Sequence, residues 1–190
     1  MEYRRFGHKL VLRLDPEEEV VQCLTKLCEQ EDISLAEVSG LGAASEVELG
    51  LFDTDTKAFQ GKCLKGAYEI ASLTGSITRK DGEPYLHLHG VIGNPVKGEC
   101  HGGHLVRAVI SATAEIFVDI LPGEVGRRMS REIGLNLFDF PESQEGGGTD
   151  GWNGFPYRPR RPGFCTKDGK GKPEIPAGTD RGRGHVHAPP

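Results

Sequence analysis

Hydrophobic and polar residues alternate near the start of the chain and then change to a helical spacing. Lys9–Leu14 has leucine at every second position and a β-branched valine between two of them, which is typical of a half-buried strand. Asp15 and Pro16, followed by acidic residues, predict a helix start with a capping residue and a proline at the first helical position. The helix expected to follow ends around Glu31 and packs on a sheet as one amphipathic layer. Its apolar face would consist of Val20, Val21, Leu24, Leu27 and Cys28.

Most of the pattern after this helix predicts strands. We expect them over residues 33–40, 46–52, 68–78, 85–92, 104–110 and 113–121. Turn signals separate them at Asp81-Gly82, Asn94-Pro95 and Gly102-Gly103, and a short helix is expected at 127–133. Strands without a regular alternation of strand and helix predict an α+β fold, with a largely antiparallel sheet and one long helix packed on it.

The glycines Gly40 and Gly42 have two interpretations. A dinucleotide-binding fingerprint needs a third glycine and a helix directly after it, and neither pattern follows here. We therefore interpret residues 41–44 as a tight connection between two strands.

Composition changes near Phe140. Residues 141–190 contain 11 of the 27 glycines and 8 of the 12 prolines, and their only branched aliphatic residues are Ile175 and Val186. Such a segment buries too little apolar surface to offset the entropy cost of ordering it. The sequence thus predicts a folded domain over residues 4–140 and a disordered, Gly/Pro-rich C-terminal tail over residues 141–190.

Charge divides at the same boundary. The net charge is −5; residues 1–140 carry 15 Lys and Arg against 22 Asp and Glu, whereas residues 141–190 carry 8 against 6. Because contacts to phosphates need clustered basic side chains, an acidic domain argues against direct DNA binding by the folded part.

The five cysteines favour a reducing compartment. Their number is odd and no Cys-x-x-Cys pair occurs, so a disulfide framework is not expected. Residues 1–6 lack the apolar run of a signal peptide, and no stretch approaches the roughly twenty apolar residues that cross a bilayer. We expect a cytoplasmic or nuclear protein without a membrane partner.

Three histidines form a candidate metal site. His87 and His89 are two residues apart on an expected strand, so their side chains project from one face, roughly 6–7 Å apart at Cα. A turn near Asn94-Pro95 can return the next strand alongside and bring His104 to the pair. Three neutral nitrogen ligands suit Zn²⁺ and leave a coordination position open, although other transition metals fit as well. The alternative is a polar strand face whose histidines hydrogen-bond locally.

Three motifs around these histidines follow one another in a recognisable order. They are Tyr-Glu-Ile-Ala-Ser-Leu-Thr-Gly at residues 68–75, Leu-His-Leu-His at 86–89 and Gly-Gly-His-Leu at 102–105. With Ser-Gly-Leu-Gly at 39–42 and Leu-Gly-Leu-Phe-Asp at 49–53, they resemble the plant and prokaryote conserved (PPC) domain over approximately residues 4–140.

This resemblance implies an α+β fold that assembles as a homotrimer. In prokaryotic-type members it implies a metal held by positions that correspond to His87, His89 and His104. Plant members join the domain to AT-hook segments and bind AT-rich DNA in the nucleus, but they lack the histidines. The chain therefore resembles the metal-binding, prokaryotic-type branch.

Two further groups of residues are weaker candidates. Glu69 could act as a general base or hydrogen-bond a ligand histidine, but a solvated or subunit-interface charge is the simpler interpretation. In the tail, five arginines in Gly/Pro-rich surroundings are candidate DNA contacts: Arg158, Arg160, Arg161, Arg181 and Arg183. Neither arginine cluster reads Arg-Gly-Arg-Pro, and a plain solvated linker is the alternative.

Two functions follow from these features. The first is a zinc-binding homotrimeric module that is not an enzyme and associates with DNA or chromatin through its tail. The second is a metal-dependent hydrolase or lyase acting on a small molecule, with Glu69 as its candidate base. No common nucleophile or phosphate-loop motif is present, which favours the binding module.

Overall fold

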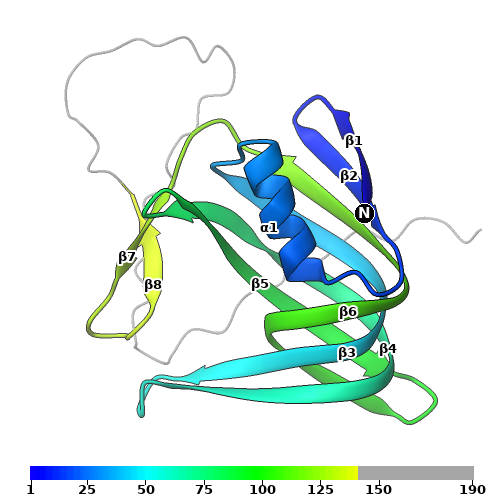
Figure 1. Cartoon of the computed structure of the whole chain (residues 1–190). Helices are drawn as coiled ribbons and strands as arrows, with labels where there is room; N and C mark the ends of the chain where they lie inside the picture. The colour runs from blue at the N-terminus through cyan, green and yellow to red at the C-terminus, as the bar shows by residue number, and fades with distance from the viewer. Residues whose placement is uncertain (141–190) are drawn as a thin grey trace, which may run out of the picture. The chain divides into compact units, whose positions relative to one another are not determined.

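The computed structural model describes residues 1–140, which form one helix and eight strands (Figure 1). In chain order the elements are β1 (Glu2–Phe6), β2 (Lys9–Leu14), α1 (Val20–Gln30), β3 (Ala36–Asp53), β4 (Ala58–Lys80), β5 (Glu83–Asn94), β6 (Glu99–Ile120), β7 (Gly126–Met129) and β8 (Asn136–Asp139). The predicted tail, residues 141–190, lies outside the described residues. In the described part, no helix is long and apolar enough to cross a membrane.

Six strands form one antiparallel sheet in the order β1-β2-β6-β3-β4-β5. Strand β6 also pairs with β5, so that β3, β4, β5 and β6 close into a ring. The second half of β6 lies between β2 and β3, whereas its first residues, 99–104, pair with β5, and pairing with β3 begins at His104. The predicted α+β fold with a largely antiparallel sheet is confirmed.

The core lies between α1 and the sheet. Leu10, Leu12 and Leu14 are buried, whereas Val11 and Arg13 between them are more exposed, as the pattern predicts. Leu24 and Leu27 bury the facing side of α1. Apolar residues recur at every second position of β2 and at every third or fourth position of α1, so each element has one apolar face. These faces contribute to a single core.

The helix starts later than predicted, because its N-cap is Glu19 and not Asp15. The Glu19 carboxylate accepts hydrogen bonds from the backbone N–H groups of Val21 and Gln22, and also from that of Ala108 on β6. Residues 15–18 instead form a turn in which Glu17 has a positive φ of 72°. The buried Glu19 carboxylate bonds both to the helix start and to the sheet, and these contacts fix the start of α1 more strongly than the local preference of Asp15-Pro16.

Two predicted pairs of strands are single continuous strands. The expected break at residues 41–44 is wrong, because β3 runs through it with register shifts between Gly40 and Gly42 and between Ala44 and Glu46. A Cβ at Gly42 would lie 2.6 Å from the backbone oxygen of Thr113, so this glycine permits close strand approach and does not form a turn. The turn expected at Gly102-Gly103 and the break near residue 111 are also absent, since β6 is unbroken.

The short helix predicted at residues 127–133 is also wrong. Residues 126–129 form β7, which pairs with β8 in a separate two-stranded sheet. Figure 1 shows this hairpin beside β4, where Arg127 donates hydrogen bonds to side chains of that strand. Contacts with distant parts of the chain override a weak local preference here.

Candidate metal centre

The three predicted histidines meet on one face of the ring of strands. His87 and His89 lie on β5, and His104 on β6 is the direct cross-strand partner of His89. Leu88, between the first two, is buried on the opposite face. Because side chains alternate along β5, leucine points into the core and histidine points outward. The turn after Asn94 brings β6 alongside β5, and β6 carries the third imidazole.

The imidazoles form a compact triangle. Their ring centroids are 5.2 Å apart for His87 and His89, 5.3 Å for His87 and His104, and 5.5 Å for His89 and His104. One nitrogen from each ring lies within 4.8 Å of the others. No other group of this kind occurs among residues 1–140.

The nitrogen separations fit a shared metal ion. Two nitrogens that each lie about 2.0–2.1 Å from a tetrahedral ion are about 3.3–3.4 Å apart. The Nε2 atoms of His87 and His89 are 3.3 Å apart. One ring nitrogen of His104 lies within 4.8 Å of this pair, so His104 is the residue that could hold the ion as a third ligand.

The surroundings favour neutral imidazoles. Burial lowers the pKa of His87, and the nearby His104, His89 and Arg127 lower it further. Burial also lowers the pKa of His104, with a smaller contribution from His89. Because a neutral ring has the lone pair that a metal needs, these shifts keep both side chains ready to coordinate at neutral pH.

Sequence comparison decides the family. Residues 1–122 match the model of the Plants and Prokaryotes Conserved (PCC) domain, which is also abbreviated PPC. The chain belongs to this family. The match contains all three histidines and ends before the β7–β8 hairpin.

Solved structures agree with this family. The PCC domain is similar to a candidate DNA-binding protein from Bacteroides thetaiotaomicron, with 30% identity and a TM-score of 0.71 over 73% of this chain and 96% of that chain. It is similar to a metal-containing protein from Archaeoglobus fulgidus, with 33% identity and a TM-score of 0.67 over 73% and 97%. A plant- and prokaryote-conserved protein from Pyrococcus horikoshii has 31% identity and a TM-score of 0.65 over 74% and 96%. No curated protein matches the chain significantly.

In this PCC domain the histidines open into a cavity of about 590 Å³. Aromatic and aliphatic side chains line much of it, including Phe52 and Phe59 from the β3–β4 hairpin and Phe138 from β8. The cavity also contains Arg127, which sequence reasoning missed. Its segment was predicted as a short helix, and no motif in residues 126–133 marks Arg127 as part of a site.

The other sequence candidates lie elsewhere. Glu69 is exposed on β4 opposite Gly93, four residues along β5 from His89, which corresponds to about 13 Å. It does not line the cavity, and its suggested catalytic role stays a prediction. His101 contacts the Tyr68 ring and is outside the triad. The five tail arginines lie outside the described residues.

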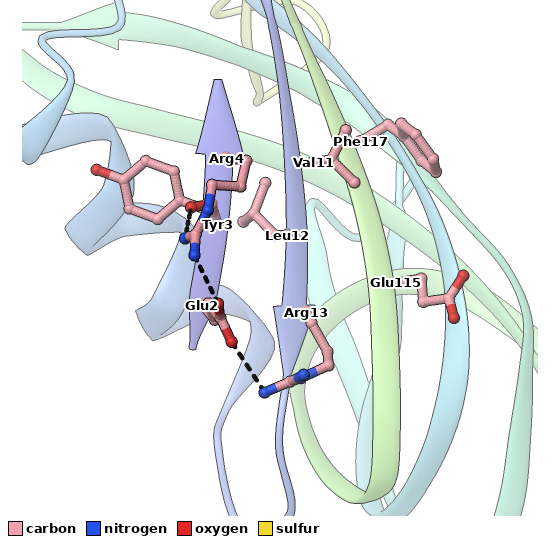
Figure 2. A pocket seen from close by; sticks show the side chains of 8 residues that line it. All are labelled: Glu2, Tyr3, Arg4, Val11, Leu12, Arg13, Glu115 and Phe117. Atoms are coloured by element: carbon pink, nitrogen blue, oxygen red, sulfur yellow. Dashed lines mark hydrogen bonds and ion pairs between the residues drawn. The ribbon is translucent and has the colours of Figure 1, made fainter. Parts of the chain in front are cut away.

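A second hollow, on β1, β2 and β6, lacks the features of a metal site (Figure 2). Its charged side chains neutralise one another, since Glu2 pairs with Arg4 at 2.9 Å and with Arg13 at 3.1 Å. No histidine or cysteine is among the described residues that line it. Among the described residues, the histidine cavity is therefore the candidate functional site of the PCC domain.

Proposed function

We propose that the chain is a metal-binding PCC module that holds one transition-metal ion, zinc by preference, on His87, His89 and His104. The observation that carries this proposal is the 3.3 Å separation of the His87 and His89 Nε2 atoms, with His104 directly across from His89. Two imidazole nitrogens face each other at this distance either through one hydrogen bond or by sharing a cation. A third imidazole at the same point favours the cation.

The donor set supports zinc. Imidazole suits several first-row metals, and a three-histidine site with an open position is a common zinc geometry. The metal-containing Archaeoglobus protein supports a metal in this family. When bound, the ion would supply a Lewis-acidic coordination position facing the cavity.

Assembly and DNA association complete the proposal. The family resemblance supports a homotrimer, and the candidate DNA-binding relative supports association with DNA. Because residues 1–140 are acidic, we assign DNA contacts to Arg158, Arg160, Arg161, Arg181 and Arg183. A cytoplasmic or nuclear location stays a prediction.

The alternative is a metal-dependent hydrolase or lyase for a small molecule. The open cavity beside the histidines favours it. Against it, no carboxylate lines that cavity within the described part of the chain, so an acid–base partner for the metal is missing there. We therefore give priority to binding.

Metal content tests the main proposal. Elemental mass spectrometry of the purified full-length chain should find close to one zinc or other transition metal per chain. His87→Ala/His89→Ala should lose it, whereas the matched control His8→Ala/His101→Ala, which also removes two histidines, should retain it. Wild-type protein that neither carries metal nor binds added zinc would refute the site.

DNA association needs a separate test. Full-length protein should shift an AT-rich duplex at low salt, and a chain ending at residue 140 should not. An equal shift by both chains would move the contact to the folded domain, and no shift by either would reject DNA association.

A further inference from the structure

Among residues 1–140, Arg127 is held in place by hydrogen bonds and aromatic contacts and has no acidic partner. Its Nε donates to Thr78 Oγ1 at 2.9 Å, one terminal nitrogen donates to Ser76 Oγ at 3.1 Å, and the other donates to the Asn136 backbone oxygen at 3.3 Å. The guanidinium carbon lies 4.8 Å from the Tyr85 ring centroid and 4.2 Å from that of Phe138. The guanidinium thus lies over two aromatic rings, within the range of cation–π contacts.

This arrangement leaves hydrogen-bonding capacity unused. A guanidinium has five N–H groups in a rigid fork, and three donate to the partners above. The next residue on β7, Arg128, pairs with Asp139 at 3.4 Å, but no carboxylate among residues 1–140 is within ion-pair distance of Arg127. Because burial also lowers the pKa of Arg127, its charge lies in a partly desolvated place. An unpaired charge in such a place favours an anionic ligand.

Arg127 and the histidines belong to one cavity. Ser76, which accepts from Arg127, is the direct cross-strand partner of His87. Side chains of such partners lie about 4.5–5.5 Å apart at Cβ. A small ligand can therefore contact the guanidinium and the histidine nitrogens together.

Among the described residues that line this cavity, Arg127 is the one side chain with a permanent charge. Three neutral imidazoles leave the full charge of a bound divalent ion, and Arg127 adds one more. None of the described residues that line the cavity is acidic. The remaining lining is largely apolar, with Phe52, Phe59 and Leu137 among its members.

We propose that the histidine cavity binds a small organic carboxylate with a flat apolar body. The carboxylate accepts from the two remaining N–H groups of Arg127 and occupies the open position of the ion, and the apolar body lies among the phenylalanines. This inference rests on the proposed metal site for part of its charge, but the contribution of Arg127 is independent of the ion. A volume of about 590 Å³ accommodates a single-ring ligand.

Titration calorimetry with benzoate tests this site in the full-length, zinc-loaded chain. Benzoate should bind, whereas the neutral analogue benzamide should bind at least about tenfold more weakly because it lacks the charge-assisted hydrogen bonds. Acetate should also bind at least about tenfold more weakly, because it lacks the buried ring. Benzamide or acetate binding as tightly as benzoate would overturn the proposed ligand class.

Variants on β7 identify the residue responsible. Arg127→Met should weaken benzoate binding at least about tenfold, and Arg127→Lys, which keeps a charge but loses the fork, should also weaken it. Arg128→Met, on the same strand, should bind like wild type. Thermal unfolding by circular dichroism shows which variants fold. If Arg127→Met does not fold, benzoate binding by Arg127→Lys tests the role of the guanidinium.

Metal content measured on the same samples separates the two proposals. All Arg127 and Arg128 variants should keep the wild-type metal content. If metal is present but benzoate binding is absent or independent of Arg127, the carboxylate inference falls and the metal site stands. If the chain holds no metal, the metal proposal falls. The carboxylate inference then survives only if benzoate still binds, more weakly than expected for a zinc-loaded chain, and if this binding depends on Arg127.

Discussion

The histidine cavity and the hollow over β1 and β2 differ in how their charges are paired. In the hollow, Glu2 pairs with Arg4 and Arg13, so the local charges satisfy one another (Figure 2). In the cavity, three imidazole nitrogens converge and Arg127 lacks an acidic partner among residues 1–140. The two regions are therefore distinguished by the pairing of their polar groups more than by their shapes: the polar groups of the cavity are available to a ligand, and those of the hollow are paired with one another.

Loss of His104 should produce the largest effect, because it removes a direct ligand. Changes of residues that only support a ligand cost about 10–100-fold in metal affinity, so His104→Ala should lower zinc affinity by at least about 100-fold. Competition with a chromogenic chelator measures this. His101→Ala, three residues away on β6 and outside the triad, serves as the control. Equal affinities of the two variants would place the metal elsewhere.

Gly103→Ala should disturb the same region through the backbone. A Cβ at Gly103 would lie 2.7 Å from the backbone oxygen of Gly50, whereas one at Gly102 would meet Val91 Cγ2 at 3.5 Å. Gly103→Ala should therefore be less stable than Gly102→Ala by about 1–3 kcal/mol in urea unfolding, and should bind zinc more weakly. Since both changes remove the freedom of one glycine, their difference isolates the clash. Indistinguishable unfolding curves would contradict the close approach of β3 and β6.

Glu31→Gln tests a smaller, pH-dependent contribution at the N-terminal edge. Hydrogen bonds from Tyr3 and Arg5, at 2.7 Å each, lower the pKa of the Glu31 carboxyl. The stabilisation is therefore present above the unfolded pKa of about 4.3 and is lost as the pH falls through the lower folded pKa. The variant should be less stable than wild type by under about 1 kcal/mol at neutral pH, with the difference shrinking in acid. A difference that grows on acidification would show the opposite sign of linkage.

Glu2→Gln should have the smallest effect. The ion pairs of Glu2 are exposed, so the free energy of unfolding should change by less than about 0.5 kcal/mol, and high salt should remove the change. Zinc and benzoate binding should not change. Any marked loss of ligand binding would connect the two regions that we describe as separate.

The sequence predicted the histidine triangle better than it predicted the strands that build it. His87 and His89 follow from the period of two, and the turn at Asn94-Pro95 places His104 beside them. Continuity of β3 and β6 could not be read locally, because Gly42 and Gly103 have the composition of turns and their tight contacts involve partners distant in the chain. Arg127 was missed for the same reason, since its position depends on β4, nearly fifty residues earlier.

The position of β6 between β2 and β3 sets an order of events during synthesis. Residues 114–119 pair with β2 on one side and residues 114–120 with β3 on the other. Because the N-terminal part leaves the ribosome first, the edge of β2 that pairs with β6 stays unpaired until these late residues arrive. Until then the nascent chain exposes an unpaired strand edge, the feature that makes folding intermediates prone to aggregation. A chain that stops before Thr113 leaves the β1–β2 hairpin without its neighbour in the sheet.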